Sequence, residues 1–140
     1  MEEQMIEYIE EKWKCKIVPT STFCLIDGIV IQDNVIKGII ELKSRNSSYE
    51  QMVQFNTLLI TFDKIKLGID MSKMLSVPFY VAIRTSDDIY LYWEICNDGI
   101  PTIGMQLDYS ETNKRTEINN DGSKISRYNA FIKINQAKRI

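Results

Sequence analysis

The pattern of apolar and polar residues changes period along the chain, and each change marks an expected element. Residues 2–14 show helical spacing, with an apolar stripe surrounded by acidic residues. That stripe consists of Met5, Ile6, Ile9 and Trp13. Two apolar, β-branched runs follow at residues 23–31 and 35–43, and both are typical of strands. Because the turn-forming residues 32–34 separate these runs, the pattern predicts a β-hairpin.

Helix and strand signals continue to alternate through the middle of the chain. The expected elements are a strand at 57–61, a helix at 63–75, and strands at 79–84 and 89–95. Residues 49–55 are ambiguous between a short helical turn and a loop. The predicted order is therefore helix, three strands, helix, strand, strand.

The last third of the chain has weaker signals. Turn-forming residues occur at 97–101 and 119–122, and residues 128–134 alternate like a strand. We therefore divide one domain into a core, residues 1–96, and a β-rich C-terminal extension, residues 97–140.

Length and composition agree with one globular domain. A chain of 140 residues with 44% hydrophobic and 26% charged residues can bury a real core. The first residues lack the features of a signal peptide, and no apolar run is long enough to span a bilayer. We expect a cytoplasmic protein without a membrane partner. The three cysteines, Cys15, Cys24 and Cys96, are too widely spaced for a zinc site and are expected to be buried thiols.

The absence of histidine excludes several classes of enzyme. Without it there are no Ser-His-Asp or Cys-His hydrolases and no histidine-ligated zinc enzymes. Carboxylate, lysine and metal chemistry remain, or no chemistry. The net charge of -2 argues mildly against a dedicated nucleic-acid binder, although a nuclease needs one basic face and carries an acidic metal site.

The predicted hairpin carries the candidate chemistry. Asp27 lies on its first strand, and Glu41 and Lys43 lie on its second. A three-residue loop would pair Asp27 with Ile39 and place Asp27, Glu41 and Lys43 on one face, where two carboxylates can hold a divalent cation. A two-residue loop would put Glu41 on the opposite face, unless a β-bulge restored the register.

These residues resemble the PD-(D/E)xK phosphodiesterase superfamily. Asp27 matches the aspartate of its motif, with Ile26 where the name has proline, and Glu41-Leu42-Lys43 matches the second part. The resemblance implies an α/β fold with an αβββαβ restriction-endonuclease-like core, in which helices flank a mixed central sheet. It extends to small phage-encoded members, in which an arginine follows the motif lysine, as Arg45 does, and a lysine opens the second helix, as Lys64 does.

The resemblance also implies a function. The expected activity is Mg²⁺- or Mn²⁺-dependent hydrolysis of DNA by an endonuclease or junction-resolvase-like enzyme, in the host cytoplasm if phage-encoded. A homodimer is an expected assembly, because such small cores often work as dimers. Asp27, Glu41 and the carbonyl oxygen of Leu42 would hold the ion, because hard oxygen ligands suit these metals. Lys43 would position water or stabilise charge. The remaining expected site residues are Arg45 and Lys64 as phosphate contacts and Glu10 as an additional acidic ligand.

Two other classes of function stay open. The chain could be an inactive nuclease fold that binds nucleic acid or protein, and divergence of Asp27 and Glu41 would favour this hypothesis. It could also be a phage structural or accessory protein that uses an exposed aromatic strand, formed by Tyr90, Tyr92 and Trp93.

Overall fold

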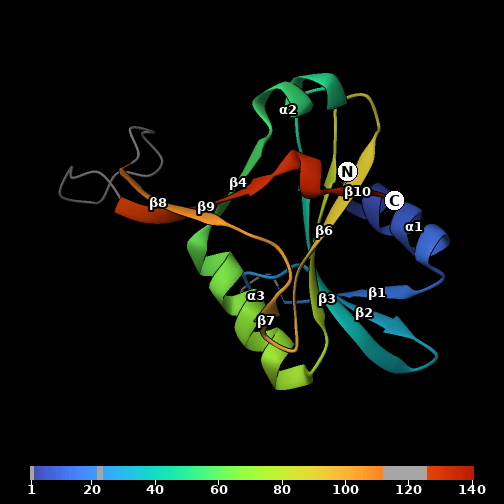
Figure 1. Cartoon of the computed structure of the whole chain (residues 1–140). Coiled ribbons are helices and arrows are strands. Elements are labelled where there is room, and N and C mark those ends of the chain that lie inside the picture. Colours follow the sequence, from blue (N-terminus) through green and yellow to red (C-terminus); the bar gives the residue numbers. More distant parts are fainter. Residues whose placement is uncertain (1, 22–23, 112–125) are drawn as a thin grey trace.

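A sheet of mixed direction forms the centre of the fold (Figure 1). The computed structural model describes residues 2–21, 24–111 and 126–140. The strand order is β1-β2-β3-β5-β6-β10, with β7 paired to β6. The strands of this sheet are β1 (Lys16–Pro19), β2 (Gly28–Gln32), β3 (Val35–Ser44), β5 (Pro78–Arg84), β6 (Tyr90–Asn97), β7 (Ile100–Pro101) and β10 (Lys138–Arg139). Strands β3 and β5 are parallel, and the other pairs are antiparallel.

Helices cover both faces of the main sheet. Helix α1 (Glu2–Trp13) packs on one face and α3 (Phe62–Leu75) on the other (Figure 1). The short helix α2 (Tyr49–Phe55) lies in the crossover from β3 to β5. The α3 side holds the larger cluster of buried apolar side chains, which includes Ile65 and Phe79. The predicted mixed sheet flanked by helices is confirmed.

A second, smaller sheet contains one strand that the sequence pattern assigned to the core. Its order is β4-β9-β8, formed by β4 (Thr57–Thr61), β8 (Gln106–Glu111) and β9 (Ser126–Lys133), and the short 3-10 helix η2 (Ile134–Gln136) follows β9. Residues 57–61 therefore form a strand as predicted but lie outside the main sheet. The first strand of the αβββαβ core is instead β1, which the pattern missed. Four residues ending in proline are too short to show alternation, and such a strand suits a sheet edge.

The hairpin of β2 and β3 differs from its predicted form. Its turn has two residues, Asp33 and Asn34, both with positive φ, and Gln32 pairs with Val35. Of the two loop lengths that the sequence left open, the structure has the shorter one, and Ile39 pairs with Ile29 and not with Asp27. A β-bulge restores the register, because Val30 pairs with Gly38 and Ile31 with Ile36. Asp27 immediately precedes Gly28, which pairs with Ile40, and this register brings Asp27 beside Glu41.

The aromatic strand does not provide an exposed surface. Trp93 is 1% exposed and its Nε1 donates to the carbonyl oxygen of Lys133 at 2.9 Å. Tyr90 is also buried, and its ring stacks on Tyr8 of α1 with 3.9 Å between centroids. Tyr92 is partly buried beneath Trp13. The hypothesis of an accessory protein acting through this strand is therefore wrong.

Some expected features lie outside the residues that the structure describes. The predicted turn at 119–122 and the start of the first hairpin strand at Phe23 lie outside the described residues. The cysteines are free, but Cys15 and Cys24 are partly exposed, so only Cys96 is the buried thiol that was expected. No helix in the described part of the chain is long and apolar enough to cross a membrane.

Helix α3 approaches β5 at a glycine, which explains a residue that is otherwise unfavourable in a helix. A Cβ on Gly68 would lie 2.2 Å from the Phe79 ring. The glycine therefore sets how closely α3 packs on the sheet, and this helix carries Lys64.

We predict that Gly68→Ala lowers the free energy of unfolding by about 1–3 kcal/mol, because the overpacking outweighs the gain of about 1 kcal/mol in helix propensity. Urea denaturation measures the change. The double variant Gly68→Ala/Phe79→Leu should recover part of the loss, since it removes the ring. A stabilised Gly68→Ala would contradict the close packing.

Candidate active site

Asp27 lies at the open end of the hairpin, immediately before β2 begins. Its Oδ2 accepts a hydrogen bond from the backbone N–H of Leu42 at 2.7 Å. The N–H of Leu42 therefore bonds to a side chain, because β2 begins only at Gly28 and offers no backbone carbonyl at this position. The bond fixes the Asp27 side chain beside the stretch of β3 that carries Glu41 and Lys43.

Glu41 is the most unusual residue of the main sheet. Its side chain points to the α3 face of β3 and is 1% exposed, although its neighbours along the strand are apolar. Its Oε1 accepts a hydrogen bond from Nζ of Lys64 at 2.6 Å. Its Oε2 is buried and has no hydrogen-bond partner among the described residues. An ionised carboxylate in such a place needs a compensating cation.

Two lysines supply positive charge at this carboxylate. Lys64 comes from the first turn of α3, and Lys43 comes from β3, two residues after Glu41 and on the same face. Nζ of Lys43 lies 3.6 Å from Oε1 of Glu41. The structure therefore brings together Asp27, Glu41, Lys43 and Lys64. Lys64 was predicted as a phosphate contact, and the contact that the structure shows is with a carboxylate.

The site shifts the pKa values of its ionisable groups. Burial raises the pKa of the Glu41 carboxyl, the hydrogen bond from Lys64 works against this rise, and the charge of Asp27 adds to it. Burial lowers the pKa of Lys43, and the neighbouring Lys64 lowers it further. Burial also acts to lower the pKa of Lys64, but the bond to Glu41 and the charges of both carboxylates raise it overall.

Arg45 follows directly after β3, next to this cluster. Its guanidinium donates to the carbonyl oxygens of Ser44 at 3.4 Å and Leu59 at 3.3 Å. Burial lowers its pKa. Both partners are neutral, so these contacts orient the side chain and leave its charge available.

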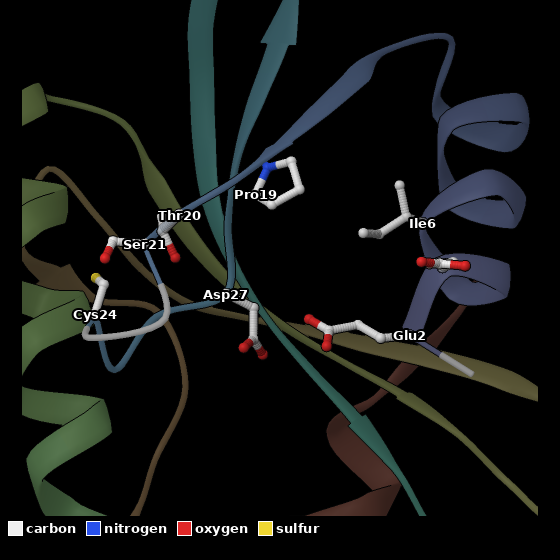
Figure 2. A pocket seen from close by; sticks show the side chains of 8 residues that line it. Glu2, Ile6, Pro19, Thr20, Ser21, Cys24 and Asp27 are labelled. Carbon is white, nitrogen blue, oxygen red and sulfur yellow. The ribbon is translucent and has the colours of Figure 1, made fainter.

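A pocket of about 330 Å³ opens beside Asp27, on the side of α1. Its acidic lining residues are Glu2, Glu3 and Asp27, and Figure 2 shows the carboxylate of Glu2 directed toward that of Asp27. Glu10, the acidic residue predicted for the site, accepts a hydrogen bond from the N–H of Ile17 at 2.9 Å. Eight residues of helix, about 12 Å, separate it from Glu2. The structure therefore gives Glu10 a role in joining α1 to β1, and α1 presents Glu2 to the site.

Residues 1–108 match a family described as "Phage putative PDDEXK endonuclease". The chain belongs to this family. The matched region contains all the site residues described above.

The fold is similar to that of a solved structure. It is a Holliday junction resolvase, Hjc, from the archaeal hyperthermophile Archaeoglobus fulgidus, with 14% sequence identity and a TM-score of 0.47. The similarity covers 64% of this chain and 74% of the resolvase chain. A comparison with curated proteins finds no match.

PD-(D/E)xK nucleases generally depend on divalent metals, and the residues present suit such an ion. The buried, unpartnered Oε2 of Glu41 is an oxygen that a cation would satisfy. Within the described residues, no group of three or more His, Cys, Asp or Glu side chains forms a metal cage. A hydrated divalent cation would fit this arrangement, because such an ion can keep several waters and bind through one or two carboxylates.

We predict that, in EDTA, Glu41→Gln gains stability relative to the wild type as pH rises. The folded state raises the pKa of Glu41, so the stability linked to this group is complete below the unfolded-state pKa and is lost as pH rises through the folded-state pKa. Glutamine keeps the neutral form at every pH. The stability difference should therefore grow as pH rises from 4 to 8.

Thermal unfolding across this pH range measures the effect, and Glu11→Gln on the exposed side of α1 is the matched control. Adding Mg²⁺ should stabilise the wild type more than Glu41→Gln. A pH-independent difference between wild type and variant would contradict the electrostatic cost assigned to Glu41.

Proposed function

We propose that this protein is a divalent-metal-dependent endonuclease that hydrolyses phosphodiester bonds of DNA. The observation that supports this function best is the buried carboxylate of Glu41, which lies beside Asp27 and is flanked by Lys43 and Lys64. One of its oxygens has no hydrogen-bond partner among the described residues. A purely structural site would not need a buried acid in an apolar strand. Membership of a phage endonuclease family supports DNA as the substrate.

Asp27 and Glu41 would hold the metal ion, together with the carbonyl oxygen of Leu42. The N–H and C=O of one strand residue point to the same edge, and the N–H of Leu42 already meets Asp27. The carbonyl of Leu42 is therefore directed to that side too. When bound, Mg²⁺ or Mn²⁺ would supply a nucleophilic water of lowered pKa and would offset negative charge developing on the phosphate.

The two lysines have different positions and therefore different proposed roles. Lys64 forms the short contact to Glu41, so it positions that carboxylate and reduces the cost of burying it. Nζ of Lys43 lies farther from Glu41, at 3.6 Å from Oε1, so its ammonium is free to act on the attacking water or the phosphate. Arg45 and Lys64 are both proposed phosphate contacts. Lys64 is paired with Glu41, whereas the bonds of Arg45 are to neutral carbonyl oxygens.

The central experiment is incubation of the protein with supercoiled plasmid, a four-way junction and single-stranded DNA, each with Mg²⁺, Mn²⁺ or EDTA. We expect metal-dependent internal cleavage of at least the plasmid. Linear DNA formed directly from supercoiled plasmid would support a homodimer, since two strands need two sites. Nicked circles would favour a protein that acts as a monomer.

We predict that Asp27→Ala and Glu41→Ala each abolish this cleavage while the fold is retained. Either change removes an oxygen ligand that the other residues cannot replace. Glu11→Ala, an exposed acid on α1, should keep wild-type activity. Circular dichroism checks the fold, and full activity in either site variant would overturn the assignment.

We also predict that Lys43→Ala reduces turnover by roughly 100-fold or more, as for other lost electrostatic stabilisers, while Mn²⁺ affinity is largely kept. Lys64→Ala should weaken Mn²⁺ binding as well, because it removes the partner that orients Glu41. Calorimetry with Mn²⁺ separates the two roles.

Lys66→Ala is the control for the second lysine, because it removes an exposed charge from the same helix. It should leave both turnover and Mn²⁺ affinity unchanged. Equal metal affinity in Lys64→Ala and Lys66→Ala would contradict the positioning role of Lys64.

A further inference from the structure

A second polar pocket, of about 200 Å³, lies beyond the carboxyl ends of the parallel strands β3 and β5. It is separate from the pocket beside Asp27 and shares no lining residue with it. The loop after β3 contributes one wall and the loop after β5 the other. Its lining residues are Ser44, Arg45, Asn46, Arg84, Thr85, Ser86 and Asp88.

Hydrogen bonds between the two loops hold this pocket in shape. The N–H of Arg45 donates to the carbonyl oxygen of Arg84, and the N–H of Ser86 donates to that of Ser47, both at 2.9 Å. Thr85 is 2% exposed, and its Oγ1 accepts from the N–H of Ile89 at 2.9 Å. The pocket is therefore formed before any ligand binds, which lowers the ordering cost of binding.

The charges in the pocket favour an anion. Arg84 is balanced by Asp88, whose Oδ1 lies 2.6 Å from Nη2, and it also donates to Gln4 of α1. Arg45 has no carboxylate partner among the described residues, so the pocket keeps one uncompensated positive charge. The side chains of Asn46 and Ser86 line the pocket and are exposed, so both can donate to a ligand.

The pocket lies beyond the end of β3 that carries Lys43 of the candidate active site. Arg45 comes two residues after Lys43, which corresponds to about 7 Å along an extended chain. A ligand that reached from Lys43 into the pocket would therefore follow the end of β3. A nucleic-acid strand is such a ligand, because it carries a charged phosphate at each nucleotide.

We propose that this pocket binds a backbone phosphate of the strand that is cut, farther along that strand than the phosphate at Asp27 and Glu41. Arg45 provides the charge, and Asn46 and Ser86 provide neutral donors that recognise phosphate oxygens without reading the base. This inference rests on the proposed nuclease function and adds a direction for the substrate, from the carboxylates toward the loops after β3 and β5.

The test compares two variants that each convert an asparagine to aspartate. Asn46→Asp places a negative charge in the pocket, and Asn34→Asp places the same charge in the turn at the opposite end of β3. Binding of a single-stranded DNA oligonucleotide is measured by fluorescence anisotropy in Ca²⁺, which replaces Mg²⁺ to limit cleavage. We expect Asn46→Asp to weaken binding about tenfold at low salt, with a smaller loss at high salt, and Asn34→Asp to stay near the wild type.

A second measurement locates the phosphate. Oligonucleotides that carry one uncharged methylphosphonate linkage at successive positions should show one linkage, on one side of the cleavage site, that weakens wild-type binding. The same linkage should cost Asn46→Asp little more, because the two changes remove one interaction. Equal losses in the two asparagine variants, or additive effects of the linkage and Asn46→Asp, would overturn the proposed subsite.

The result also separates the pocket from the proposed function. If Asp27→Ala abolishes cleavage and Asn46→Asp binds like the wild type, the nuclease assignment stands and the subsite is wrong. If Asn46→Asp alone weakens binding and the wild type shows no metal-dependent cleavage, the subsite stands and the catalytic assignment is wrong.

Discussion

The ion pair between Glu41 and Lys64 is the constraint on which the rest of the site depends. A carboxylate that is 1% exposed within an apolar sheet is costly to ionise, and a contact of 2.6 Å to an ammonium offsets part of this cost. The compensation is incomplete, because the second oxygen has no partner among the described residues. An arrangement that leaves one buried oxygen unsatisfied is poorly suited to stability alone and well suited to binding a cation.

The pair requires that two elements distant in sequence dock closely. Lys64 can reach Glu41 because α3 lies against β3 and β5, and Gly68 permits that approach where any Cβ would meet Phe79. On the other side of Glu41, the bulge in the hairpin brings Asp27 to the matching position. The helix contact and the bulge thus act together, one supplying the positive charge and the other the second carboxylate.

The site lies at one end of the main sheet, between two openings of different character. The pocket beside Asp27 is acidic and receives Glu2 from α1, as Figure 2 shows. The pocket at the loops after β3 and β5 contains Arg45 and Arg84. A metal ion and a phosphate chain have opposite charges, so this separation gives each a suitable surface. In the proposed nuclease, it would also let a protein of net charge -2 offer a local basic surface to nucleic acid.

The sequence by itself determined the helices and strands that show a clear period, and it identified Asp27, Glu41 and Lys43 as neighbours on a hairpin. It did not determine which strands share a sheet, because alternation records which face is buried and not which strand lies beside it. The pattern therefore predicts residues 57–61 as the third strand of the core although they pair in the second sheet, and β1 was missed because it is too short to show a pattern. The partners of Lys64, Glu10 and Glu2 depend on where two helices dock. Docking is set by contacts between residues far apart in sequence, such as Gly68 with Phe79, and no local pattern contains that information.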